Sequence, residues 1–144
     1  MPVRSASAAT QAVRTAWALL ILRLGLAAIF LPYGIVKLFT FPARVEHFAS
    51  LEFPLPALIV AINLTLEIGA GLLLVCGVNM RLAATLVVLD TLAILTLVNW
   101  NASPLDWWPQ IAMRVAPAVA LALVGPGAFR IGHPTGPGAQ TAPA

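Results

Sequence analysis

Four long apolar blocks, separated by short segments rich in proline, glycine and asparagine, dominate the chain. They cover residues 16–39, 56–78, 82–100 and 107–124, and each holds between 18 and 24 residues. About 20 apolar residues in an α-helix span the roughly 30 Å hydrocarbon layer of a bilayer. Because a backbone inside lipid must satisfy its own hydrogen bonds, we predict an all-α fold, a bundle of four transmembrane helices.

The connections and the two ends of the chain complete this domain plan. The first connection, residues 40–55, is the longest, and its middle, residues 43–51, is predicted to form a short helix on the membrane surface. Residues 1–15 are rich in Ala, Ser and Thr and are predicted to be a flexible tail. Residues 132–144 are dense in Gly and Pro and are predicted to be disordered. The membrane domain is therefore residues 16–131.

The composition agrees with a membrane protein and excludes several other classes. Only 9% of the residues are charged and 60% are hydrophobic, whereas soluble domains carry about 25% charged residues. The basic residues are scattered, so no nucleic-acid partner is indicated. Cys76 is the single cysteine, which excludes an intramolecular disulfide and a CxxC redox motif. A cleaved signal peptide is disfavoured because the first apolar block is too long and Arg23 interrupts it.

The distribution of Lys and Arg predicts the orientation of the bundle. With four crossings, both tails and the second connection share one side of the membrane. That side carries Arg4, Arg14, Arg81 and Arg130, against Lys37 and Arg44 on the other side. Because cytoplasmic loops are enriched in basic residues, we predict that both termini are cytoplasmic.

Each apolar block contains one ionisable residue near its middle: Arg23, Glu67, Asp90 and Arg114. A charged side chain at the bilayer centre costs at least about 2.5–3.5 kcal/mol on insertion scales. Two bases and two acids can offset this cost if they converge inside the bundle. We therefore predict a buried network with Glu67 and Asp90 at its centre and the two arginines reaching them; the sequence leaves open which arginine pairs with which acid.

Helical spacing adds further polar residues to the same faces. Asn63 lies one turn before Glu67, and Lys37, Tyr33 and Gln110 are predicted to form the rim of a pocket around the network. The Gly69–Gly71 run predicts a close helix crossing, because small residues let helix backbones approach. The network has two interpretations, a proton-relay or substrate pocket, or a set of contacts that only fixes packing.

Cofactor and metal motifs are not evident. His47 and His133 both lie outside the apolar blocks, so a haem bound within the bundle is not indicated. No zinc, Walker or Rossmann spacing occurs in the sequence. No catalytic residue can be assigned, and it stays open whether the chain is an enzyme or a subunit of one.

Two stretches of sequence resemble the DoxX family of small bacterial membrane proteins. The run from Leu22 to Phe39 has the family's early Arg, mid-helix Phe, and Gly followed by Lys; here these are Arg23, Phe30, Gly34 and Lys37. The run from Phe48 to Ala84 has a Pro-x-Pro entry, a Glu before small residues, and a later Gly and Arg; here these are Pro54, Pro56, Glu67, Gly69, Gly71, Gly77 and Arg81. The GPG at residues 125–127 resembles the family's ending of the fourth helix. Asp90 and Arg114 are not part of the family pattern.

The resemblance implies a four-helix protein of the bacterial inner membrane, with links to quinone-coupled redox systems. A first hypothesis is therefore a membrane subunit, or a quinone-interacting component, of such a system. Quinone would be the ligand, and a soluble oxidoreductase or a second copy of the chain the partner. A small transporter or proton path, and a non-catalytic membrane scaffold, are the alternatives.

Overall fold

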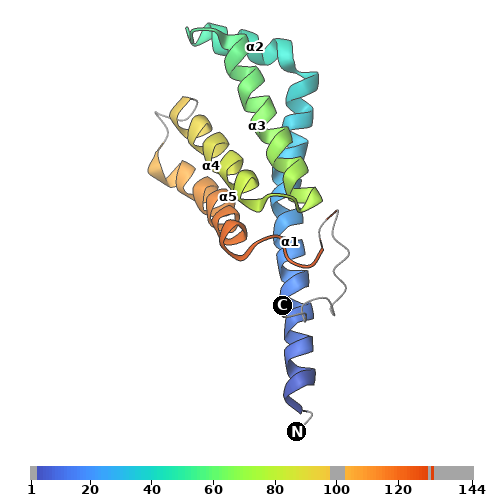
Figure 1. Ribbon diagram of the computed structural model, residues 1–144. Helices are drawn as coiled ribbons and strands as arrows, with labels where there is room; N and C mark the ends of the chain where they lie inside the picture. The colour runs from blue at the N-terminus through green and yellow to red at the C-terminus, as the bar shows by residue number, and fades with distance from the viewer. Residues whose placement is uncertain (1–2, 98–102, 130, 132–144) are drawn as a thin grey trace.

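Five α-helices make up the part of the chain that the computed structural model describes, which is residues 3–97, 103–129 and 131 (Figure 1). The helices are α1 (Val3–Phe39), α2 (Phe41–Ser50), α3 (Pro56–Cys76), α4 (Met80–Leu97) and α5 (Pro104–Val124). No strand occurs in these described residues, in agreement with the predicted all-α class. The short α2 overlaps the short helix predicted within the first connection.

The four long helices pack in a simple order. α3 lies against both α1 and α4, and α5 packs against α4, while α2 lies across the end where α1 meets α3 (Figure 1). After α5 the chain returns to the far end of α3, where the Ile131 amide donates a hydrogen bond to the Cys76 carbonyl at 3.0 Å. The bundle thus has one end capped by α2, and an opposite end where α3 and α5 finish.

The first helix begins much earlier than the sequence predicted. α1 starts at Val3, so the segment expected to be a flexible tail is helical. Side chains 7–15 are nevertheless all exposed, as expected for a solvated segment. The segment is rich in alanine, the strongest helix former, and it continues a helix that is already nucleated. The other tail, residues 132–144, lies outside the described residues.

Small residues set the distance between α1 and α3. A Cβ added to Gly71 would lie 2.6 Å from Leu31 Cγ, and one added to Gly34 would lie 2.7 Å from Ile68 Cγ1. The predicted close crossing is therefore confirmed at Gly71. Gly69 is different, because a Cβ there would meet Leu86 on α4 at an ordinary 3.5 Å. The close approach brings Lys37, one turn beyond Gly34, over the polar face of α3.

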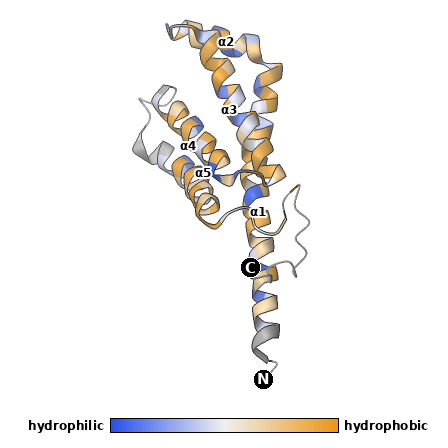
Figure 2. Cartoon of the chain, in the orientation of Figure 1, coloured by the Kyte–Doolittle hydropathy of each residue, from blue (hydrophilic) through white to orange (hydrophobic). Residues whose placement is uncertain are grey.

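An apolar core fills the middle of the bundle and the end opposite α2. It consists of Leu26, Ala27, Phe30, Ala70, Leu74, Met80, Ala83, Ala84, Val87, Ala118 and Leu121. The outer surface is apolar as well, with exposed Ile21, Leu58, Leu89 and Leu123 on four different helices. Hydrophobic residues predominate along these helices (Figure 2). Two helical stretches, Ser7–Phe39 and Pro56–Cys76, are long and apolar enough to cross a membrane, and Trp108–Val124 is a shorter apolar stretch. A surface this apolar suits lipid rather than water.

Candidate functional site

A chain of polar contacts joins α1, α3 and α4 in the half of the bundle nearer α2. Lys37 Nζ on α1 lies 2.5 Å from Glu67 Oε1 and also donates to the side-chain oxygen of Asn63. Asn63 Nδ2 in turn donates to Asp90 Oδ1 at 2.5 Å. We refer to Lys37, Glu67, Asn63 and Asp90 together as the polar chain. The asparagine is the bridge, because it accepts from the ammonium and donates to the second carboxylate.

The two carboxylates of the polar chain are almost fully buried. Glu67 is 3% exposed and Asp90 is 0% exposed. Each has one oxygen, Glu67 Oε2 and Asp90 Oδ2, without a hydrogen-bond partner among the described residues. Buried polar atoms in proteins are nearly always hydrogen-bonded. These two oxygens therefore retain capacity to accept a hydrogen bond from a bound molecule or to take a proton.

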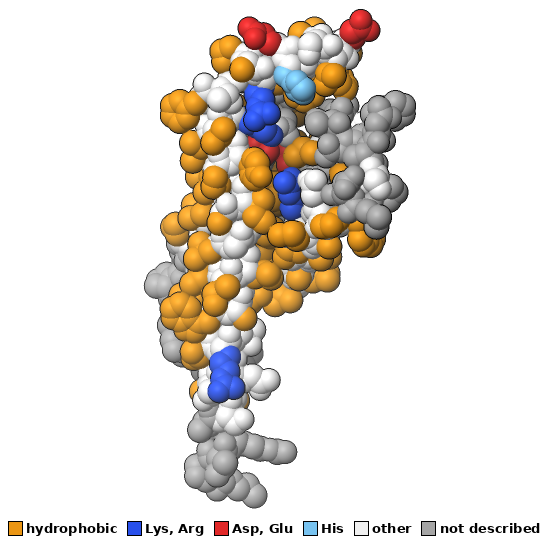
Figure 3. Space-filling model, turned by 180° about the vertical axis from the view of Figure 1, so that it is seen from behind, with side chains coloured by type: hydrophobic (Ala, Val, Ile, Leu, Met, Phe, Trp, Pro, Cys, Tyr) orange, Lys and Arg blue, Asp and Glu red, His pale blue; other side chains and the backbone are white. Residues whose placement is uncertain are grey.

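A pocket of about 370 Å³ opens beside the polar chain and is lined by residues from all five helices. Its polar lining is Tyr33, Lys37, Arg44, His47, Asn63, Glu67, Gln110 and Arg114, and its apolar lining is Phe48, Ile59, Val60, Ile62, Leu66, Ala93 and Ile94. Seen from behind, basic side chains and a histidine gather around a hollow with acidic atoms at its floor (Figure 3). A largely apolar cavity with a few convergent polar groups is the usual form of a small-molecule site.

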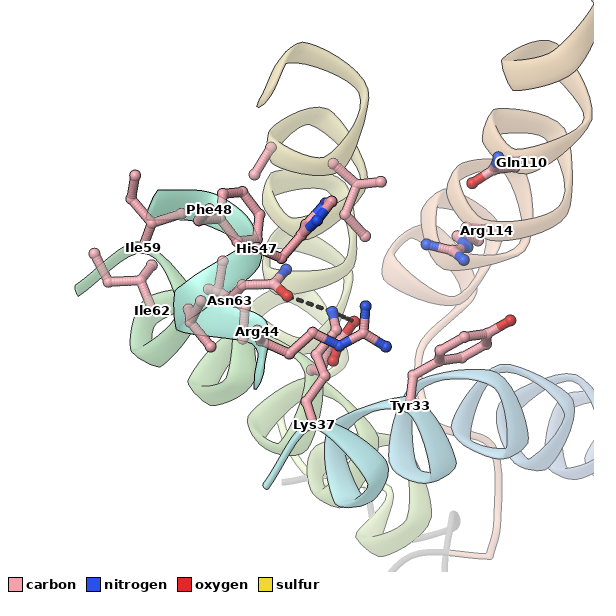
Figure 4. Close-up of a pocket in the computed structure, with 15 residues that line it drawn as sticks. Tyr33, Lys37, Arg44, His47, Phe48, Ile59, Ile62, Asn63, Gln110 and Arg114 are labelled. Atoms are coloured by element: carbon pink, nitrogen blue, oxygen red, sulfur yellow. Dashed lines mark hydrogen bonds and ion pairs between the residues drawn. The ribbon is translucent and has the colours of Figure 1, made fainter. Parts of the chain in front are cut away.

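Arg44 and Arg114 enter the pocket from opposite sides. Figure 4 shows Arg44 on α2 and Arg114 on α5 pointing into the same space, with Lys37 and Asn63 joined on its floor. The Arg114 guanidinium carbon lies 5.7 Å from the centre of the Phe30 ring and 5.9 Å from that of Tyr33. Both distances fall within the range of cation–π contacts. Among the described side chains, neither arginine has an acidic partner within ion-pair distance.

Arg23 lies outside this network, contrary to the prediction from sequence. Its guanidinium donates to the carbonyls of Leu74 (3.0 Å) and Val75 (2.9 Å) at the end of α3, and to Pro126 (2.9 Å) and Phe129 after α5. The Leu74 and Val75 carbonyls are free because the last turn of a helix lacks its own donors. Gly77 allows the approach: its φ is +71°, and a Cβ there would lie 2.5 Å from Arg23 Nη2. Arg23 thus joins α1 to the end of α3 and to the segment after α5, and it does not reach Glu67 or Asp90.

The other predicted site residues are brought together, with changed roles. Asn63 donates to Asp90, Lys37 joins Asn63 to Glu67, and Tyr33 and Gln110 line the pocket. Lys37, expected at the rim, is the basic partner of Glu67 and takes the place foreseen for an arginine. Arg114 reaches the pocket but forms no ion pair with a described acid.

The site predicted from sequence did not include Arg44 and His47, two polar residues that line the pocket. Both lie on α2, which was placed at the membrane surface outside the predicted site. Arg44, His47 and Phe48 are spaced i, i+3 and i+4, so they share one face of α2. That spacing was a usable signal that one polar face of α2 turns toward the bundle. No group of three His, Cys, Asp or Glu side chains in the described residues is placed to hold a metal ion.

Comparison with known proteins identifies the family to which the chain belongs. The DoxX family model matches residues 18–100, which include all four members of the polar chain. The chain belongs to the DoxX family. It is also 30% identical over 122 residues to the inner membrane protein YphA of Escherichia coli strain K12, covering 78% of this chain and 86% of that protein. No solved structure matches it significantly. This DoxX-family chain is therefore a membrane protein of the bacterial inner membrane.

Proposed function

We propose that this DoxX-family protein is a membrane component of a redox system and that its pocket binds a quinone head group. The observation that carries the proposal is the position of Glu67. It lies on the floor of a pocket of about 370 Å³, is held by Lys37, and keeps one carboxylate oxygen without a partner among the described residues. Such a floor offers both a fixed charge pair and a group that can exchange a proton with a bound molecule.

The lining suits a quinone in two respects. A quinone ring has two carbonyl oxygens that accept hydrogen bonds, and Lys37, Gln110 and Arg114 supply donors around the cavity. Ile59, Ile62, Leu66 and Ile94 provide an apolar wall for the ring and the start of its tail.

Reduction of a quinone to a quinol consumes two electrons and two protons. In this proposal the two electrons come from an oxidoreductase partner and the two protons come from water at the mouth of the pocket. The Glu67 carboxylate, paired with Lys37 at rest, takes up each proton in turn and passes it to a quinone oxygen. Asp90, linked to Lys37 through Asn63, is the second carboxylate of the same hydrogen-bonded chain. The protein's own part is to bind and orient the head group and to hold or move protons at the carboxylate oxygens.

The proposal includes four membrane crossings by α1, α3, α4 and α5, with α2 on the periplasmic surface and both termini in the cytoplasm. Arg14 and Arg81 then lie at the cytoplasmic end, and the longer α1 continues into the cytoplasm. Asn63 and Glu67 lie about 10 Å and about 16 Å along α3 from its first residue. The pocket accordingly occupies the outer half of the membrane.

The packing favours a binding site over a transport path through one chain. Below the polar chain, the apolar core residues Phe30, Ala70, Leu74, Val87 and Leu121 are each at most 1% exposed. They separate the pocket from the cytoplasmic end of the bundle, so the described residues offer no continuous polar route. A scaffold role, in turn, gives no reason for charged side chains to line a cavity.

A quinone titration in lipid nanodiscs tests the proposal. The wild-type protein should bind a short-tailed quinone saturably, measured by equilibrium dialysis against empty nanodiscs. Glu67→Gln should weaken binding about tenfold, which corresponds to about 1.4 kcal/mol, because Lys37 loses the ion pair that fixes it as a donor to a quinone oxygen. Arg81→Gln, an exposed change on α4 at the opposite end of the bundle, is the control and should bind like wild type. Unsaturable partitioning into the lipid, or equal binding by Glu67→Gln, would contradict the proposal.

A further inference from the structure

We infer that the mouth of the pocket holds a second binding site, in which Arg44 and Arg114 clamp an acidic oxyanion group such as a phosphate, sulfonate or carboxylate. This site lies in the same cavity as the floor formed by Lys37 and Glu67 and shares Arg114 with the proposed quinone site, but it does not require a redox role. The inference rests on the charge of the cavity, the surroundings of Arg114 and the directions of the two arginine side chains.

The charge of the cavity is unbalanced. Lys37, Arg44 and Arg114 line it, against the single carboxylate of Glu67. Adding Asp90, which lies behind Asn63, gives three basic groups against two acidic ones. Lys37 is paired with Glu67, and Asp90 keeps its charge because Asn63 is neutral, so the net excess is one positive charge shared between Arg44 and Arg114. An anionic group is the ligand that neutralises this excess.

Arg114 gives the stronger evidence for an anion site, because it lies in apolar surroundings. It is half-buried on α5, in the shorter apolar stretch Trp108–Val124. Its contacts with the Phe30 and Tyr33 rings fix the guanidinium near the cavity but do not neutralise it. A cation in apolar surroundings is costly without an anionic partner, and no described acidic side chain forms an ion pair with it.

The geometry suits an oxyanion. Arg44 and Arg114 project from different helices toward the same space, so a group between them can receive donors from both sides (Figure 4). Guanidinium groups form paired, parallel hydrogen bonds with phosphate and carboxylate oxygens, which makes arginine well suited to such clamps. The neighbouring apolar side chains Ile59, Ile62 and Ile94 favour an anion attached to an apolar body. A lipid head group and a free oxyanion share this chemistry.

The test uses the full chain in nanodiscs of phosphatidylcholine, with or without added phosphatidylglycerol. Native mass spectrometry measures retained anionic lipid, and thermal unfolding with added inorganic phosphate or sulfate measures the free anion. The test variant is Arg44→Gln with Arg114→Gln. The matched control, Arg14→Gln with Arg81→Gln, removes the same charge from two exposed residues far from the pocket.

Retention of phosphatidylglycerol by wild type and control, reduced at least fivefold in the test variant, would identify a lipid head group. Stabilisation by phosphate or sulfate, lost in the test variant, would identify a free oxyanion. If neither probe binds, or if both variants bind alike, the inference is overturned. Should the double variant fail to fold, Arg44→Gln alone on the exposed α2 serves in its place. The quinone titration is run without added anions, so failure of one site is distinguishable from failure of the other.

Discussion

Replacing Arg23 by methionine is expected to destabilise the folded protein by about 3 kcal/mol or more, because several buried carbonyls lose their donor at once. Arg23 is 1% exposed and donates four hydrogen bonds to carbonyls of two separate segments. Methionine fills similar space but offers those carbonyls no N–H group. The change should appear as a large fall in the midpoint of thermal unfolding in mild detergent.

Two comparisons make the Arg23 result interpretable. Arg14→Met removes an exposed arginine from the same helix and should leave the midpoint nearly unchanged. Arg23→Lys keeps the charge but not the planar, multiply donating head, so it should fall between wild type and Arg23→Met. If Arg23→Met and Arg14→Met had the same midpoint of thermal unfolding, the assigned role of Arg23 in joining α1, α3 and the segment after α5 would be wrong.

Replacing Lys37 by methionine should cost about 3–5 kcal/mol, because it leaves Glu67 and Asp90 buried without the cation that contacts Glu67. Adding Glu67→Gln to that variant should restore much of the lost stability, since the uncompensated charge is then removed. Double-mutant analysis of chemical unfolding in detergent measures this coupling directly. Strictly additive losses for the two substitutions would show that Lys37 and Glu67 do not act as a pair.

The outline of the fold follows from the sequence because membrane-crossing helices depend on simple length and hydropathy rules. The polar cluster of Glu67, Asn63 and Asp90 was also accessible from sequence, since isolated polar residues in apolar blocks must find partners. The partners themselves were not. Gly34 lets α1 approach α3 closely enough for Lys37 to reach Glu67, and this depends on the helix crossing rather than on a motif.

The misplacement of Arg23 has a different physical origin. The position of Arg23 along its helix cannot show that α3 ends at Cys76, with Gly77 next to the guanidinium. Nor can it show that the segment after α5 folds back to the same place. The N–H groups of Arg23 donate to backbone carbonyls and not to the carboxylates of Glu67 and Asp90. Free carbonyls occur at every helix end. The early start of α1 was not predicted because the polar composition of residues 1–15 indicated a solvated tail. The alanine content of the same segment favours a helix.

Photolabelling with an azidoquinone in nanodiscs, followed by peptide mass spectrometry, tests the central claim of a quinone pocket beside the polar chain most directly. We expect adducts concentrated on residues 59–67 of α3 and 110–114 of α5, competed by unlabelled quinone and weakened by Glu67→Gln. Adducts spread over outward-facing residues such as Ile21, Leu89 and Leu123, without competition, would contradict the claim.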